Sequence, residues 1–305
     1  MTRVATLSAQ NLSLALLQQT KSRIMDAQVQ ISTGKKAERY MGVAADSARL
    51  VSLKADHARV TQFMAGNRVT EMRLQRMETS VAGMMDVASN LRTLLVSATQ
   101  AGNAGVLALP EAAGAMLSQV GNYLNIQLDG RHLFAGDRTD TPPVDFSTLP
   151  TDGVFAGDAA DLYYRGDDAR ASVRTGESST LTYGVTAADP AFDRLVKALQ
   201  IVATVDTSDP AAARDRLEEA LELAIGSISA ISDVRSRIGS ALSTIELANT
   251  QHDEFLLYAE GAIGDLENVD VTEAITRLSG HQATIEASYA SLARLQSVSL
   301  VDYLR

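Results

Sequence analysis

Residues 209–267 read DPAAARDRLEEALELAIGSISAISDVRSRIGSALSTIELANTQHDEFLLYAEGAIGDLE and contain no proline after Pro210. Alternating steps of four and three residues connect apolar positions through this stretch over about seven heptads. The positions on this seam are Leu217, Leu221, Ala224, Ile228, Ile231, Arg235, Ile238, Leu242, Ile245, Asn249, His252, Leu256, Ala259, Ile263 and Leu266. Only Arg235, Asn249 and His252 interrupt its apolar character. The spacing predicts a single coiled-coil helix, about 85 Å long at about 1.5 Å per residue.

A second seam with the same spacing occupies the N-terminal part of the chain, which has no proline before Pro110. Its positions are Leu50, Leu53, His57, Val60, Met64, Asn67, Glu71, Leu74, Glu78, Val81, Met85, Ala88, Arg92 and Leu95. Asp209 before Pro210 is a helix start signal, because aspartate caps a first turn and proline fits its first position. The two seams therefore predict two long helices that pack against each other.

Shorter apolar stripes occupy both chain ends. The first carries Leu14, Leu17, Ile24 and Ile31 and stops at Thr33-Gly34, a helix termination signal. The second starts at Asp270 with Glu273 three residues later, which resembles a capping box, and predicts a helix of about 25 residues. Its apolar positions are Val271, Ile275, Leu278, Ile285, Tyr289, Leu292 and Leu295. Neither segment can bury its stripe within itself, so each is expected to pack against the other terminus or against neighbouring copies.

The middle of the chain contains every proline and most aromatic residues. Short runs at 162–165, 171–174 and 179–183 lie between turn-forming residues and predict strands. The predicted fold is mainly α, a long antiparallel coiled-coil helical rod from the N- and C-terminal arms with a small inserted β-rich domain. The predicted divisions are an N-terminal assembly helix 1–33, a rod arm 34–130, the insert 131–190, a rod arm 191–267 and a C-terminal assembly helix 268–305.

Composition excludes several classes of protein. The net charge of −10 disfavours nucleic acid as a partner, because phosphates would be repelled. The absence of cysteine excludes disulfides and thiolate chemistry. No apolar run approaches the length of a membrane span, so no membrane partner is expected, and no secretory signal is visible.

The chain offers little for catalysis. His57, His132, His252 and His281 are far apart in sequence, and none has metal-ligand spacing. Acidic pairs are explained by turns and by a solvated helix start. We therefore expect no enzyme activity, no cofactor and no metal. Lys35-Lys36 with Arg39 is either a solvated basic loop or a source of salt bridges between subunits.

Several motifs resemble the bacterial flagellin family, over about two thirds of the chain. They are ISTGKK at 31–36, NLRTLLV at 90–96, SRIGSAL at 236–242 and the ending from Asn268 to Arg305. The segment DGRHLFAGD at 129–137 is more similar to the family members that join the flagellar hook to the filament, whereas the Leu-Arg ending is closer to the filament subunit, flagellin. The segment YMGVAAD at 40–46 departs from the family pattern and keeps only Asp46.

The resemblance implies a secreted structural subunit of the extracellular bacterial flagellum, exported by the flagellar type III apparatus. It implies a homo-oligomer in a helical assembly, with hook-associated proteins, flagellin and an export chaperone as partners. Flagellin itself and a non-flagellar coiled-coil scaffold remain alternatives. The residues expected to form the coiled-coil and assembly interfaces are Leu14, Leu17, Ile24, Ile31, Leu50, Leu53, Val60, Leu74, Val81, Leu95, Leu221, Ile228, Ile231, Ile238, Leu242, Ile245, Leu256, Ile263, Ile275, Leu278, Ile285, Leu292 and Leu295.

Overall fold

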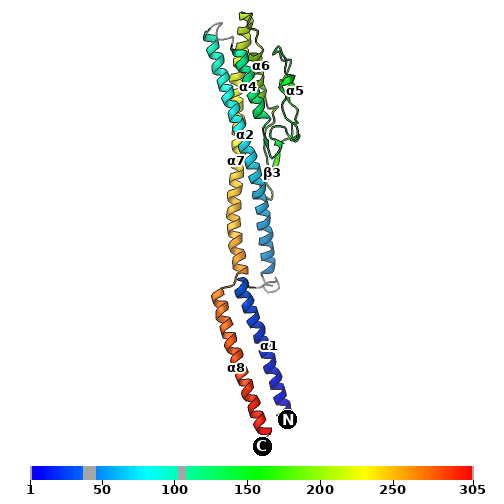
Figure 1. Ribbon diagram of the computed structural model, residues 1–305, viewed down its shortest axis with the longest axis vertical. Helices are drawn as coiled ribbons and strands as arrows, with labels where there is room; N and C mark the ends of the chain where they lie inside the picture. The colour runs from blue at the N-terminus through cyan, green and yellow to red at the C-terminus, as the bar shows by residue number, and fades with distance from the viewer. Residues whose placement is uncertain (1, 37–45, 102–107, 304–305) are drawn as a thin grey trace. The chain divides into compact units, whose positions relative to one another are not determined.

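A computed structural model describes residues 2–36, 46–101 and 108–303 of the chain, with side-chain surroundings for 11–36, 46–98, 108–209 and 211–294. The helices are α1 (Thr2–Thr33), α2 (Ser47–Ala101), α4 (Leu109–Leu124), α5 (Ala160–Tyr163), α6 (Pro190–Ala203), α7 (Pro210–Glu267), α8 (Val271–Tyr303) and the 3₁₀ turn η2 (Phe146–Thr148) (Figure 1). The strands are β1 (Gln127–Leu128), β2 (Arg131–His132), β3 (Ser172–Arg174) and β4 (Thr180–Thr182). The mainly α fold with a small β-containing insert is confirmed.

The chain forms two compact units. Unit 1 contains residues 1–59 and 254–305, and unit 2 contains residues 60–253. The long helices α2 and α7 contribute residues to both units. The predicted single helix from Pro210 is confirmed as α7, and the Asp209 carboxylate accepts from the backbone N–H of Ala211 at 3.1 Å and of Ala212 at 3.3 Å.

Unit 2 contains a continuous hydrophobic core between α2, α4, α6, α7 and the insert. Aromatic rings fill its centre: Phe134 meets Phe192 edge to face at 5.9 Å, and Phe146 meets Tyr163 in the same way at 5.3 Å. The Tyr163 hydroxyl donates to the Ala187 carbonyl at 2.9 Å, which satisfies the one polar atom of a fully buried side chain. This core explains why the insert stays attached to the long helices despite its few strands.

Two amphipathic helices, α4 and α6, were not separated from the arms in the sequence analysis. Each begins with a proline in its first turn, and the Asp189 carboxylate caps α6 by accepting from the backbone N–H of Ala191 at 3.0 Å. The two helices pack against each other within unit 2. They are therefore separate packing elements beside α2 and α7, not extensions of either long helix.

The insert holds two separate two-stranded antiparallel sheets, β1–β2 and β3–β4. The strands predicted at 171–174 and 179–183 are confirmed as β3 and β4. The strand predicted at 162–165 is wrong, because α5 ends at Tyr163 and only Tyr164 forms an isolated bridge, to Val144. Asp193 explains the helical turn, since its buried carboxylate accepts from the backbone N–H of Ala160 at 2.9 Å.

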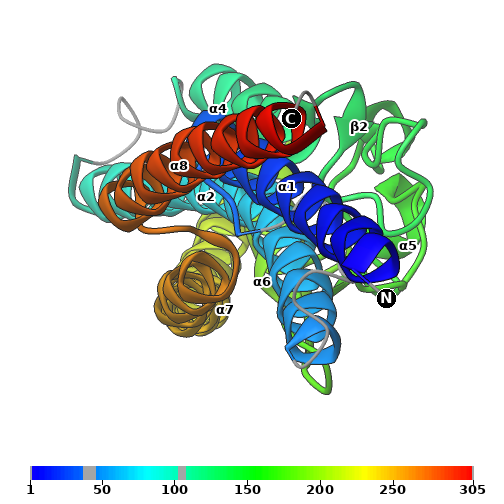
Figure 2. The ribbon, with the colours of Figure 1, turned by 90° about the horizontal axis from the view of Figure 1, so that it is seen from below.

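In unit 1, α1 and α8 pack against each other and run in opposite directions (Figure 1, Figure 2). The Asp270 carboxylate caps α8 by accepting from the backbone N–H of Thr272 at 2.8 Å and of Glu273 at 3.1 Å. The buried apolar side chains described in this unit are Leu17, Ala27, Leu50, Ala259 and Ala274. Three of them are alanines, so unit 1 has a much thinner core than unit 2.

Candidate assembly interface

The polar residues that interrupt the α7 seam each have a partner in unit 2. Arg235 donates through Nε and a terminal nitrogen to one oxygen of Glu78 on α2, at 2.9 and 2.6 Å. Both residues are polar breaks in their respective seams. Because the two breaks meet, the pairing contributes to the alignment of α2 against α7.

A second polar layer joins the same two helices. The Asn67 side-chain nitrogen donates to the side-chain oxygen of Asn249 at 2.8 Å. Asn67 is fully buried, and its side-chain oxygen has no hydrogen-bond partner among the described residues. Amide pairs in a coiled-coil core favour one register over others at a cost in stability.

The third interruption connects α7 to the insert. His252 Nε2 donates to the Thr175 carbonyl at 2.6 Å, just beyond β3. Its ring stacks on Phe63 with centroids 6.0 Å apart, and the Arg174 guanidinium lies 5.7 Å from the Phe63 ring centre. This histidine therefore fixes the β3–β4 hairpin onto the coiled coil.

In unit 1 the turn after α1 is joined to the turn before α8. Lys35 and Asn268 form an antiparallel bridge, and the Val269 N–H donates to the Gly34 carbonyl at 2.9 Å. The Lys36 N–H donates to the Glu267 carbonyl at 2.7 Å. These bonds determine where α1 and α8 leave the ends of α2 and α7.

The Glu267 carboxylate is the electrostatic centre of this junction. It forms ion pairs with Lys54 on α2 and with Lys35, whose ammonium nitrogen lies 3.4 Å away. The hydrogen bond from Lys54 is the main reason that the pKa of Glu267 lies below its ordinary value. The basic cluster was expected to be a solvated loop or a source of salt bridges between subunits. Within the single chain Lys35 pairs instead with Glu267, and Arg39 lies outside the described residues.

Large apolar side chains are exposed on both terminal helices. They are Leu12, Leu14, Leu16, Met25 and Val29 on α1, and Val271, Ile275 and Tyr289 on α8. A groove between the two helices is lined by Leu16, Leu17, Leu292 and small residues of α8 such as Ala283 and Ala287. Exposed large apolar side chains on helices with a thin core are typical of surfaces that associate.

The expected interface residues fall into three groups by burial. Buried ones are Leu17, Leu50, Leu74, Val81, Leu95, Ile231, Ile238 and Ile245. Half-buried ones are Ile24, Ile31, Leu53, Val60, Leu221, Ile228, Leu242, Leu256, Ile263, Leu278, Ile285 and Leu292. Leu14 and Ile275 are exposed, and the Leu295 side chain lies outside the described residues. Complete burial is thus concentrated in the helices that have several neighbours.

The sequence analysis did not identify Lys54, Glu260 or Glu267 as members of this interface. His57, which it placed on the seam, lies with its Nε2 3.4 Å from a carboxylate oxygen of Glu260. Lys54 and Glu267 carry no local motif, and only the alignment of α2 with α7 brings them together.

Within the ranges that the structure describes, no group of three acidic or histidine side chains could hold a metal ion. His132 is buried, and its ring nitrogens contact the Asn125 carbonyl at 2.9 Å and the Gln127 side chain at 2.8 Å. Among the described residues, no helix is both long enough and apolar enough to cross a membrane.

Comparison with known proteins places both arms in one family. Residues 4–139 match the bacterial flagellin N-terminal helical region, and residues 221–304 match the bacterial flagellin C-terminal helical region. The chain is 23% identical to flagellar hook-associated protein 3 of Escherichia coli (strain K12) over 295 residues, which is 89% of this chain and 90% of that protein.

Solved structures show the same fold. FlgL of Bacillus cereus is similar with a TM-score of 0.56 at 17% identity, over 71% of this chain and 99% of that chain. Flagellar hook-associated protein-3 from Legionella pneumophila is similar with a TM-score of 0.58 at 13% identity, over 71% of this chain and 98% of that chain. The two matched helical regions lie on either side of the insert and together cover most of the chain, so the chain belongs to the bacterial flagellin family.

Proposed function

We propose that this chain is a structural subunit of the flagellum that joins the hook to the filament, and that copies bury their α1/α8 pairs against one another. The observation that carries the proposal is the contrast within unit 1. Its core is thin, yet both terminal helices expose large apolar side chains. The names of the hook-associated relatives and the similarity of residues 129–137 to junction members support the junction role over the filament role.

Burial of the exposed terminal side chains supplies the driving force for assembly. Each square ångström of apolar surface removed from water contributes about 25 cal/mol. The ends also gain order, because helix pairs with little core are marginal alone and become stable when packed. We therefore propose that α1 and α8 become fully ordered only when copies associate.

The geometry of such an assembly follows from the contact type. A contact between two different surfaces of identical copies does not close on itself unless the rotation happens to form a ring, and so produces a helix of subunits. Unit 2, with its continuous core, is the part that is already stable before association.

The proposal also includes export of the chain and a chaperone that covers its apolar side chains before assembly. The chain would leave the cell through the flagellar type III apparatus and act in the extracellular flagellum. An export chaperone would cover the exposed apolar side chains of a terminal helix, since such a surface promotes aggregation in the free chain.

The test uses purified full-length chain, isolated hook fragments and flagellin, observed by negative-stain electron microscopy. The expected result is binding at hook ends and filament growth from those ends only when this chain is present. Long filaments formed by this chain alone would identify it as a filament subunit instead. Discrete dimers with no affinity for hooks would favour a coiled-coil scaffold and contradict the proposal.

A further inference from the structure

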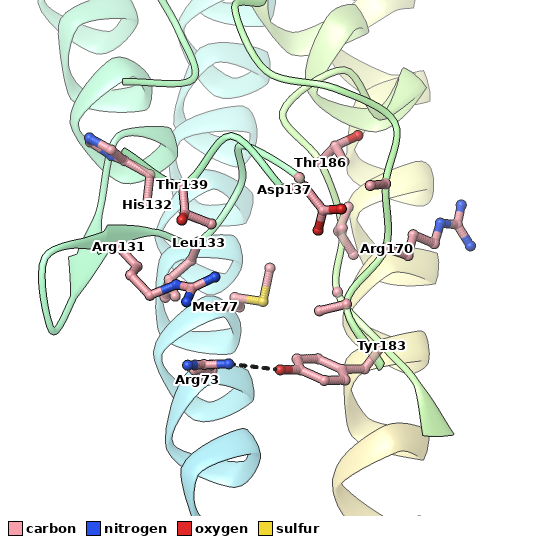
Figure 3. A pocket seen from close by; sticks show the side chains of 15 residues that line it. Arg73, Met77, Arg131, His132, Leu133, Asp137, Thr139, Arg170, Tyr183 and Thr186 are labelled. Carbon is pink, nitrogen blue, oxygen red and sulfur yellow. Dashed lines mark hydrogen bonds between the residues drawn. The ribbon is translucent and has the colours of Figure 1, made fainter. Parts of the chain in front are cut away.

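Two arginines, Arg73 and Arg131, share one wall of a pocket in unit 2 (Figure 3). The cavity measures about 70 Å³, and its apolar lining includes Met77 and Leu133. Asp137 reaches in from the opposite wall. A cavity of this size admits the end of one side chain, such as a carboxylate group.

Local structure fixes the position of each arginine. Arg73 projects from α2 and donates through a terminal nitrogen to the Tyr183 hydroxyl at 3.2 Å (Figure 3). Arg131 directly follows the two-residue turn Asp129-Gly130, which joins β1 to β2 and has positive φ at both residues, 52° and 74°. Such turns match the twist of a short hairpin, and glycine takes the second position without strain. Arg131 is thus presented from a rigid turn.

The opposite wall is equally defined. Gly136 has a φ of 71°, and an added Cβ there would lie 2.1 Å from the Asp167 carboxylate oxygen. The same carboxylate oxygen accepts from the backbone N–H of Asp137 at 2.9 Å. This loop holds Asp137 across the cavity, so the space between the walls is preserved and is not closed by the chain itself.

The electrostatics favour an anion beside the arginines. In the part of the chain that the structure describes, neither Arg73 nor Arg131 has a carboxylate partner within ion-pair distance, and Asp137 does not reach them. A third arginine, Arg170, lines the rim, although Figure 3 shows its guanidinium directed outward. Guanidinium groups bind carboxylates through two parallel hydrogen bonds, and two of them on one wall make a carboxylate the best-matched ligand.

An exposed acidic stripe on α7 has the complementary chemistry. Asp215, Glu219 and Glu222 lie on one face of the helix because they are four and three residues apart. All three are exposed, and none has an ion pair within the described ranges. The neighbouring Arg216 donates to the Gly153 carbonyl at 2.8 Å, so this part of α7 is held at the loop around residue 153 and lines no part of the pocket.

We infer that the arginine pocket of one copy binds the acidic stripe of a second copy. The inference rests on the proposed function, because it requires copies to lie next to one another. Charge complementarity argues for this occupant, because the two arginines face an opposite charge and the chain carries ten more acidic than basic residues. Pocket and stripe are different surfaces, so each copy can bind one neighbour through its pocket and another through its stripe.

Charge exchange tests the contact on hook fragments. Arg131→Glu and Glu219→Arg should each reduce the amount of chain that co-sediments with hooks about tenfold, and the double variant should restore it to near the wild-type level. Both side chains are exposed and outside the core, and thermal unfolding checks that the variants fold. Equal binding by wild type and single variants, or a double variant no better than either single one, would overturn the inference.

Cross-linking tests the same contact without hooks, and the lack of native cysteine makes it clean. The variant Arg131→Cys/Glu219→Cys, treated with a short bis-maleimide at high protein concentration, should give a ladder of multimers. The matched control Arg131→Cys/Glu246→Cys places the second thiol on another exposed position of α7 and should give no ladder. No ladder from the first pair, either in solution or on hooks, would contradict the pocket–stripe contact. If wild type fails to bind hooks while the ladder forms, the proposed function fails and this contact stands.

Discussion

Lys54, near the start of α2, and Glu267, the last residue of α7, form an ion pair although 213 residues separate them. Lys35 approaches the same carboxylate from the turn after α1. The Glu267 carbonyl accepts from the backbone N–H of Lys36. One residue thus connects the ends of two long helices with the turn that leads out of α1.

Glu267→Gln should loosen this junction without unfolding the helices. The substitution removes both ion pairs and keeps the side-chain shape, so the cost is about 1 kcal/mol, as expected for partly exposed pairs. Amide hydrogen exchange should become faster at Lys36 and Val269, whose N–H groups bond across the junction. Exchange in the unit 2 core provides the internal control, and an equal increase in both places would indicate general destabilisation instead.

The same junction should weaken in acid. The pKa of Glu267 is held below its ordinary value of 4.5 in the folded chain, chiefly by the hydrogen bond from Lys54. The stabilisation is therefore complete above the unfolded pKa and is lost as the pH falls through the lower, folded one. The protection of the Lys36 and Val269 amides, which is the intrinsic exchange rate at each pH divided by the observed rate, should fall below about pH 4.5 in wild type. The Glu267→Gln variant should lack this pH dependence, and an identical profile in both would contradict the assignment.

Asn249→Ala should be more damaging than replacement of both asparagines by leucine. The single change leaves the buried Asn67 side chain without its partner, which costs about 1–3 kcal/mol. The double change Asn67→Leu/Asn249→Leu replaces the pair by apolar contact and should leave the stability unchanged or raise it. It should also allow α2 and α7 to pair in more than one register, because the polar pair that selects one register is gone. Thermal unfolding measures the stabilities, and exchange rates along α2 report the register. A double variant less stable than Asn249→Ala would disprove this reading of the pair.

Gly83→Ala should destabilise unit 2, whereas Gly114→Ala should not. An added Cβ at Gly83 would lie 2.4 Å from the Tyr123 ring, which packs from α4 onto α2, so the ring must shift at a cost of about 1–3 kcal/mol. An added Cβ at Gly114 meets no described atom within 4 Å, and alanine there should stabilise α4 by up to about 1 kcal/mol. Denaturant unfolding compares the two. Tyr123→Leu should relieve the Gly83→Ala defect, and its failure to do so would point to a backbone cause.

Features that depend on near neighbours in the chain could be predicted from the sequence. The α7 seam, the cap at Asp209 and the cap at Asp270 each involve residues within one or two turns, and all three are present. The polar positions Arg235, Asn249 and His252 could be identified in the sequence because the spacing of the seam places them among apolar residues. Their partners were not, because Glu78, Asn67 and Thr175 are selected by the alignment of separate elements.

Features created by tertiary packing could not be predicted. The strand predicted at 162–165 has suitable β-forming residues, but the buried Asp193 carboxylate stabilises a helical turn there instead. The helices α4 and α6 carry Pro110 and Pro190 in their first turns, and the sequence analysis did not interpret these prolines as helix start signals. The arginine pocket joins Arg73 to Tyr183, 110 residues apart, so no local pattern could reveal it.

Leu14→Gln and Ile275→Gln should separate assembly from folding. These side chains are 53% and 50% exposed in the single chain, so each substitution should change the free energy of unfolding by no more than about 0.5 kcal/mol. Binding to hook ends should fall sharply, because copies would have to bury an amide without a partner. Val154→Gln, at a position in the insert that is 58% exposed, is the matched control and should change neither property. Leu17→Gln, at a buried position of α1, should reduce both. Normal hook binding by Leu14→Gln and Ile275→Gln would mean that copies do not associate through this face of α1 and α8.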